Sequence, residues 1–150
     1  MTTQPLTSAK HMPTLAVMLV VLALAAGPAQ AEGPTCNLLG GQGELNACAA
    51  DNFKAADARL DEVYARAVTK AQGWDAELDP DQKGAEKSLR EAQRAWITYR
   101  DETCNAESYR FYRGSVRPMF RLSCKTRVTD VRTEELREMV EINPMTGNAD

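Results

Sequence analysis

Apolar residues recur every three or four positions over most of the chain, which is the spacing of one face of an α-helix. The first such stretch runs from Glu44 to about Ala71, and Gly73 is its expected stop. No segment alternates apolar and polar residues for long enough to predict a strand. The apolar face of this first helix consists of Leu45, Phe53, Ala56, Leu60, Val63, Tyr64 and Ala67.

A second helix is predicted from Pro80 to about Tyr112. Its start combines Asp79 as an N-cap acid, Pro80 at the first helical position and Gln82 three residues after the cap. The residues that follow at heptad-like spacing are Leu89, Ala92, Trp96, Tyr99 and Thr103.

Glycine and proline close together between Arg113 and Pro118 interrupt the helical pattern. We expect a short helical segment through Phe120, Leu122 and Cys124, and a last amphipathic helix from about Asp130 to Ile142. Asn143-Pro144 ends this helix, and residues 143–150 are expected to form a disordered tail. The chain is therefore predicted to be all-α, with a long antiparallel helical hairpin followed by shorter C-terminal helices.

The hairpin predicts which polar residues meet. If the two long helices are joined near residues 73–79, Asp57 faces Arg100, Leu60 or Asp61 faces Trp96, and Tyr64 faces Gln93. We interpret this group as structural rather than catalytic, because buried polar groups must be paired whatever the protein does. The predicted polar cluster is Asp57, Tyr64, Gln93, Trp96 and Arg100.

The N-terminus resembles an export signal. Lys10 and His11 precede an apolar run from Leu15 to Ala26, and Ala29-Gln30-Ala31 follows as a small-x-small cleavage site. The pattern predicts a signal peptide over residues 1–31, with a retained membrane anchor as the alternative. The run is shorter than the about 20 apolar residues that span a bilayer, and residues 32–150 contain no other candidate span. We therefore expect a periplasmic or secreted mature chain.

All four cysteines lie in that mature chain, which in an exported protein predicts two disulfides. Cys36 precedes the first helix and Cys48 lies in its early turns, while Cys104 and Cys124 flank the reversal, so these two local pairs are favoured. Cys48 with Cys104 and Cys36 with Cys124 also fits the hairpin and stays open. The predicted fold is thus a small, disulfide-stapled helical bundle.

The same residues leave little chemistry for a metal site or an active site. There is no CxxC motif and no histidine after His11, so we expect no metal, no cofactor and no Ser-His-Asp or Cys-His catalytic site. A carboxylate-only hydrolase would need two acids converging in a cleft, which a slim helical bundle seldom provides. No catalytic residue is therefore predicted, and the sequence does not indicate an oligomeric state.

Charge is distributed unevenly. Once Lys10 leaves with the signal peptide, 17 basic and 21 acidic residues give the mature chain a net charge of −4. A stretch without acids nevertheless carries six bases, which could attract anionic glycans, lipid head groups or nucleic acid. A solvated face is the commoner explanation, and nucleic acid is set aside because an exported protein rarely meets it. The six bases are Arg110, Arg113, Arg117, Arg121, Lys125 and Arg127.

A combination of motifs resembles a known family. It comprises Cys36, Gln42, Glu44, Asn46 and Cys48, then Ala56-Asp57 with Leu60 and Tyr64, then AQRAWITYRDETC at residues 92–104, then Gly114-Ser115, Cys124, Thr129, Arg132-Thr133 and Leu136. Over residues 32–150 the chain resembles the lysozyme inhibitor LprI-like N-terminal domain family of secreted bacterial proteins. The resemblance implies a periplasmic binding protein that inhibits lysozyme. The chain departs from the family in lacking a lipobox before Cys36, and in carrying Arg113-Gly114-Ser115 where many members have Gly-Gly-Ser.

Inhibition of a lysozyme or another muramidase by occlusion is the first predicted function. Such enzymes use two carboxylates in a cleft. The candidate plug is the loop from Arg113 to Pro118, in which Gly114 permits close approach and Ser115 and Arg117 are able to bind those carboxylates. A simple helix-ending turn is the alternative interpretation of these residues.

The second predicted function is a periplasmic envelope interaction module without enzyme inhibition. It would bind an anionic polymer or a protein partner through the bases from Arg110 to Arg127. Binding through exposed arginines should weaken as salt rises, which distinguishes the two functions.

Overall fold

Three long helices make up the part of the chain that the computed structural model describes, residues 34–141. They are α1 (Gln42–Ala76), α2 (Ala85–Ser108) and α3 (Arg117–Glu141), and a short 3-10 turn, η1 (Tyr109–Phe111), follows α2. No strand occurs within these residues, and the predicted all-α class is confirmed. The predicted signal peptide and the predicted tail of residues 143–150 lie outside the described residues.

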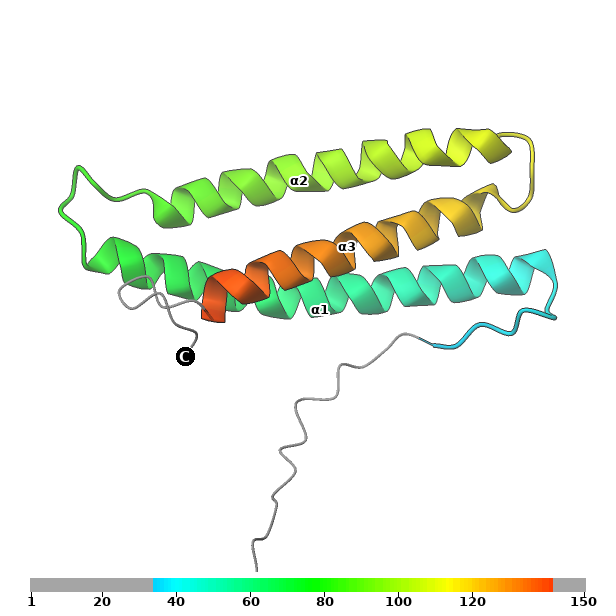
Figure 1. Ribbon diagram of the computed structural model, residues 1–150, viewed down its shortest axis with the longest axis horizontal. Helices are drawn as coiled ribbons and strands as arrows, with labels where there is room; N and C mark the ends of the chain where they lie inside the picture. Colours follow the sequence, from blue (N-terminus) through cyan, green and yellow to red (C-terminus); the bar gives the residue numbers. More distant parts are fainter. Residues whose placement is uncertain (1–33, 142–150) are drawn as a thin grey trace, which may run out of the picture. The chain divides into compact units, whose positions relative to one another are not determined.

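The helices lie side by side (Figure 1). α2 runs antiparallel to α1, which is the predicted hairpin, and α3 turns back antiparallel to α2 and parallel to α1. α3 makes its most extensive contacts with α1 rather than with α2. The bundle therefore has two ends: a first end with the α1–α2 connection, and a second end with the α2–α3 turn and the start of α1.

The predicted division of the C-terminal region into shorter helices is wrong, because α3 is one continuous helix. The pattern looked interrupted because two of the positions that face the other helices carry threonine. Thr129 and Thr133 are both buried, and the Thr133 hydroxyl donates to the Thr129 carbonyl at 2.9 Å. Pro118 does not break the helix because it lies in the first turn, where its missing N–H has no intrahelical partner to lose.

α1 is longer than predicted, since it continues through Gly73 to Ala76. A glycine inside a helix weakens it without ending it. The extra turn brings Trp74 against the apolar core, and this packing explains why the helix continues.

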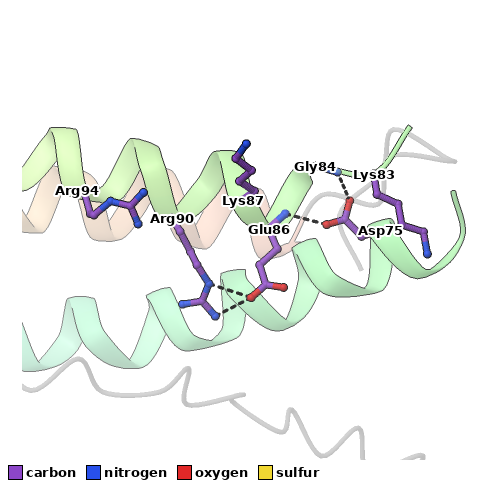
Figure 2. Close-up of a pocket in the computed structure, with 7 residues that line it drawn as sticks. All are labelled: Asp75, Lys83, Gly84, Glu86, Lys87, Arg90 and Arg94. Atoms are coloured by element: carbon purple, nitrogen blue, oxygen red, sulfur yellow. Dashed lines mark hydrogen bonds and ion pairs between the residues drawn. The ribbon is translucent and has the colours of Figure 1, made fainter. Parts of the chain in front are cut away.

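The start of α2 was also predicted wrongly. Pro80 lies in a turn, and the helix begins at Ala85. The cap comes from α1: the Asp75 carboxylate accepts backbone N–H bonds from Gly84 at 2.8 Å and Glu86 at 3.0 Å (Figure 2). It also accepts one from Ala85 at 2.9 Å. These bonds hold the pKa of Asp75 below its ordinary value. A carboxylate on one helix thus both caps the next helix and fixes the connection between them.

We expect Asp75→Asn to lower the melting temperature at neutral pH by roughly 3–5 °C, as the loss of a charged cap does in a small domain. A depressed pKa in the folded state adds stability that is present above the unfolded pKa and disappears as pH falls through the folded pKa. The difference between parent and variant should therefore shrink in acid. Thermal melts followed by circular dichroism from pH 7 down to pH 2 measure this, and a difference independent of pH would contradict the assignment.

The large apolar side chains of the core gather toward the first end. They come from α1, with Leu89 of α2 and Leu136 of α3. Toward the second end the buried positions are small or polar, among them Ala49, Cys104 and Ser108. The second end therefore depends on covalent and polar contacts more than on apolar burial. The α1 residues of this core are Leu60, Val63, Ala67, Val68 and Ala71.

Candidate binding site

Two disulfides hold the second end. Cys36 is bonded to Cys48, 12 residues away, with their Cα atoms 5.7 Å apart, and Cys104 is bonded to Cys124, 20 residues away, at 5.5 Å. These are the two local pairs, and the rival pairing does not occur. The first bond ties the segment before α1 onto that helix, and the second ties the end of α2 to α3.

Arg100 is the centre of the polar cluster. One of its terminal guanidinium nitrogens donates to Asp57 Oδ1 at 2.8 Å, so these two residues meet across the hairpin. The guanidinium carbon lies 5.1 Å from the ring centroids of both Phe53 and Trp96. The same side chain lies 3.4 Å from Thr129 Oγ1, which adds α3 to the group.

The other two members of the cluster lie apart from Arg100. Gln93 Oε1 accepts from Arg132 Nε of α3 at 3.1 Å. Tyr64 interacts with Arg90 and packs at the edge of the apolar core. The structure therefore brings Asp57, Trp96 and Arg100 together and gives Gln93 and Tyr64 different partners.

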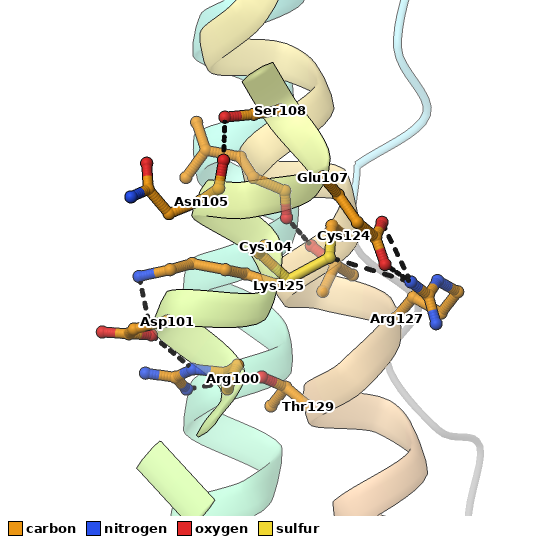
Figure 3. The surroundings of a disulfide bond; sticks show 12 residues. Arg100, Asp101, Cys104, Asn105, Glu107, Ser108, Cys124, Lys125, Arg127 and Thr129 are labelled. Carbon is orange, nitrogen blue, oxygen red and sulfur yellow. Dashed lines mark hydrogen bonds and ion pairs between the residues drawn. A yellow bond between two sulfur atoms is a disulfide. The ribbon is translucent and has the colours of Figure 1, made fainter. Parts of the chain in front are cut away.

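Asp101 links Arg100 to Lys125, which follows the disulfide-bonded Cys124 in the sequence. It accepts from Arg100 Nε at 2.9 Å and from Lys125 Nζ at 2.8 Å (Figure 3). Burial alone would raise the pKa of Asp101, but the hydrogen bonds from Lys125 and Arg100 hold it below its ordinary value. A carboxylate kept ionised between two cations is suited to a structural role and poorly suited to proton transfer at neutral pH.

The α2–α3 turn carries the residues predicted as a plug. Gly114 and Ser115 are exposed at its tip. The Gly114 N–H donates to the Phe111 carbonyl at 2.8 Å, and the Ser115 carbonyl accepts from Asn46 Nδ2 of α1 at 3.1 Å. A Cβ at Gly114 would lie 3.3 Å from Val116 Cγ1, so the glycine also serves packing within the turn. The backbone of this turn is fixed and its Ser115 side chain faces solvent.

Arg117 folds back onto the end of α2. Its Nε donates to Ser108 Oγ at 3.1 Å, and a terminal nitrogen donates to Asn105 Oδ1 at 3.3 Å. Its guanidinium carbon lies 4.4 Å from the ring centroid of Tyr109 and 5.3 Å from that of Tyr112, and the two rings stack on each other. Arg117 therefore supports an exposed pair of tyrosines, and only part of it faces solvent.

The predicted basic stretch divides into paired and unpaired groups. Lys125 pairs with Asp101, and Arg127 pairs with Glu107 at 3.4 Å. Within residues 34–141, by contrast, Arg113 and Arg121 have no hydrogen-bond or ion-pair partner. The unpaired charges of this stretch thus lie at the α2–α3 turn and in the first turns of α3.

The sequence interpretation missed a second exposed turn at the same end. Leu38 is 82% exposed and Leu39 is 96% exposed. They occupy a turn in which the Gly40 N–H donates to the Asn37 carbonyl at 3.0 Å and the Leu39 N–H donates to Asn37 Oδ1 at 3.1 Å. The turn itself could have been predicted from Asn37 and Gly40, since asparagine and glycine are typical turn residues.

A pocket of about 440 Å³ lies at the first end of the bundle (Figure 2). Its acids are already engaged, Asp75 by backbone N–H groups and Glu86 by Arg90 at 2.7 Å. In the described part of the chain no three potential ligand residues are close enough to hold a metal ion, and no helix is long and apolar enough to cross a membrane. The pocket is lined by Asp75, Lys83, Gly84, Glu86, Lys87, Arg90 and Arg94.

Comparison with known proteins decides the family. A family model described as lysozyme inhibitor LprI matches residues 37–136. The chain belongs to the LprI family. The match includes the polar cluster around Arg100 and the α2–α3 turn, and it confirms the resemblance inferred from the motifs. An uncharacterized protein of Rhizobium meliloti (strain 1021) is 38% identical over 129 residues, which cover 84% of this chain and 93% of that relative. No solved structure matches the chain.

The LprI family is named for lysozyme inhibition, so family membership supports a function of that kind. Two disulfides fit an oxidising compartment outside the cytoplasm.

Proposed function

We propose that this LprI-family protein is exported, loses residues 1–31 after Ala31, and inhibits a lysozyme or another muramidase in the periplasm or outside the cell. It inserts the α2–α3 turn into the catalytic cleft and excludes the glycan. The observation that carries the proposal is a fixed, convex turn with an exposed Ser115 beside the unpaired guanidinium of Arg113.

The chemistry of the turn suits a cleft that holds carboxylates. Glycoside hydrolases use a pair of Asp or Glu residues about the scissile bond. A guanidinium binds a carboxylate through two parallel hydrogen bonds, and a serine hydroxyl adds a third donor. Arg113 and Ser115 are the contact residues in this proposal, Gly114 keeps the tip narrow, and Arg117 holds the turn and the two tyrosines beside it.

Preorganisation supports the same role. Asn46 of α1 donates one hydrogen bond to the turn, and the disulfide between Cys104 and Cys124 joins the two helices that the turn connects. A loop that is already fixed loses little conformational freedom when it binds, so more of the contact energy contributes to affinity.

The charge of the whole protein assists the approach. The processed chain, with 17 basic and 21 acidic residues, has a net charge of −4, while the α2–α3 turn carries the unpaired Arg113. A basic muramidase is attracted by the net negative charge at long range and meets the basic turn only at its acidic cleft.

The test is lysis of a peptidoglycan suspension by a chicken-type lysozyme while the oxidised, leader-processed protein is titrated in. We expect saturable inhibition by the parent and at least a tenfold loss of potency in Arg113→Gln/Ser115→Ala, as for residues at the centre of an interface. The matched control is Arg94→Gln/Ser88→Ala, which changes an exposed arginine and an exposed serine on α2 and should inhibit like the parent.

Arg117→Ala distinguishes a residue that holds the turn in place from residues that contact the muramidase. It should reduce potency and also change the near-ultraviolet circular dichroism of the stacked tyrosines, whereas the Arg113 and Ser115 changes should leave that spectrum intact. No inhibition by the parent at a large molar excess would rule out this enzyme class as the target.

A further inference from the structure

Exposed apolar side chains are concentrated at the second end of the bundle. Leu38 and Leu39 project from the turn before α1, and Tyr109 and Tyr112 lie on and just after η1. Phe120 in the first turn of α3 is partly exposed and stacks on Phe111, with ring centroids 3.9 Å apart. Scattered apolar residues on a surface are normal, but a cluster of this kind marks an interaction site.

The leucine turn and the α2–α3 turn form one surface. Asn46 of α1 bonds to the Ser115 carbonyl, and Gln42 Nε2 lies 4.0 Å from Met119 Sδ. The disulfide from Cys36 to Cys48 holds the leucine turn against the beginning of α1. Both turns accordingly lie at the same end of the helices in Figure 1.

Positive charge lies on the α2–α3 side of this apolar surface. Arg113 and Arg121 are exposed and unpaired among the described residues, and Arg110 is exposed with its Nε on a backbone carbonyl. From Ser108 to Thr129 the sequence contains no acid. The second end therefore presents two tyrosines near arginines that have no acidic partner, and two leucines on the turn before α1, where Glu44 is the acid of the first helical turn.

We propose that this end docks on an anionic lipid bilayer. Leu38 and Leu39 enter the boundary of the acyl chains, the tyrosines lie at the level of the head groups, and the arginines contact lipid phosphates. The chain binds the membrane from outside, through this surface alone. This function is separate from muramidase inhibition, although the two would use the same end and therefore exclude one another on a single molecule.

Two observations favour lipid over a protein partner. The leucines stand at the tip of a convex turn with 82% and 96% of their surface exposed, so they fit a fluid surface that adapts to them. Leucine is also under-represented among the residues that dominate protein interfaces. The unpaired arginines match phosphate groups, which bilayers present at high density without requiring a fixed geometry.

The test is sedimentation of the leader-processed, oxidised protein with sucrose-loaded vesicles, after mass spectrometry has confirmed that the apolar leader is absent. One set of vesicles contains phosphatidylcholine alone and the other contains one third phosphatidylglycerol. We expect binding to the anionic vesicles, at least tenfold weaker binding to the neutral ones, and loss of binding as salt rises.

Variants test whether these residues form the lipid-binding surface. Leu38→Ser/Leu39→Ser should weaken vesicle binding about a hundredfold, roughly tenfold for each leucine. Arg113→Gln/Arg121→Gln should remove the preference for anionic vesicles. The control Leu78→Ser/Val131→Ser changes two other exposed apolar residues and should bind like the parent.

Parent protein that stays in the supernatant with anionic vesicles would overturn the proposal, as would a leucine variant that binds like the parent. Loss of lysozyme inhibition in the leucine variant without any vesicle binding by the parent would also overturn it, and would assign this end to a protein partner. Vesicle binding by a parent that inhibits no lysozyme would support the lipid surface and count only against the muramidase.

Discussion

Joint replacement of Cys104 and Cys124 by serine is expected to lower the free energy of unfolding by about 3 kcal/mol. The bond closes a loop between residues 20 apart, and its loss restores the freedom of that loop to the unfolded chain. Cys104 is 0% exposed and Cys124 is 7% exposed, so the variant also places two hydroxyl groups in a dry environment. Because the large apolar residues gather toward the other end, the other contacts between α2 and α3 here are mainly polar, such as Asp101 with Lys125 and Ser108 with Arg117.

Urea unfolding of parent and variant, followed by circular dichroism, measures the loss. The comparison is Cys36→Ser/Cys48→Ser, which opens a loop of similar length between partly exposed cysteines. On loop entropy alone the two variants would differ by only about half a kcal/mol. We expect the buried bond to contribute more. Equal losses would show that burial at Cys104 adds nothing, and a loss below about 1 kcal/mol would contradict the view that this bond replaces a core.

The sequence predicted the fold correctly where apolar residues recur with helical spacing in the two helices of the hairpin. Apolar spacing predicted two long antiparallel helices, and the position of their connection placed Asp57 opposite Arg100, where the structure has an ion pair at 2.8 Å. This works because antiparallel helices joined by a short connection have little choice of register.

The failures at the start of α2 and within α3 have a common physical cause, since each depends on contacts between helices. Asp79 and Pro80 have the local chemistry of a helix start, but Asp75 caps α2 from another helix. Thr129 and Thr133 interrupt the apolar pattern in the sequence, yet both are buried inside the bundle, where the Thr133 hydroxyl bonds to the Thr129 carbonyl. Local propensity cannot include contacts that exist only after the helices pack.

The candidate site shows the same limit. The α2–α3 turn could be located from Gly114 and Pro118, but the direction of Arg117 could not, because it depends on Ser108, Asn105 and two tyrosine rings. The exposure of Leu38 and Leu39 in the leucine turn was not predicted either. Their exposure follows from the turn at Asn37, which leaves two apolar residues with nothing to pack against.

Replacement of Arg100 by alanine is expected to cost about 3 kcal/mol of stability, the lower end of the range for breaking a buried ion pair. The side chain is 8% exposed and joins all three helices through Asp57, Asp101 and Thr129. The two carboxylates are 46% and 42% exposed, so water compensates part of their loss. The remainder comes from the space left between Phe53 and Trp96, which the guanidinium fills.

The pH dependence identifies the mechanism of this loss. Hydrogen bonds from Lys125 and Arg100, acting against burial, keep the pKa of Asp101 depressed in the folded state. The stabilisation that these bonds give the folded protein is therefore present at neutral pH and disappears as pH falls through the folded pKa. The stability difference between parent and Arg100→Ala should therefore narrow below about pH 4, while Arg100→Lys, which keeps the charge without the planar fork, should recover about half of the loss at pH 7.

Arg94→Ala is the control for this measurement, since Arg94 is exposed on the same helix and its side chain has no hydrogen-bond or ion-pair partner in residues 34–141. It should change stability by less than about 0.5 kcal/mol. Urea unfolding at pH 7 and at pH 3 decides the matter. A loss of stability of similar size in both arginine variants would mean that helix propensity alone accounts for the effect. A stability difference between parent and Arg100→Ala that does not narrow in acid would mean that packing against the aromatic rings, rather than the ion pairs, holds the three helices together around Arg100.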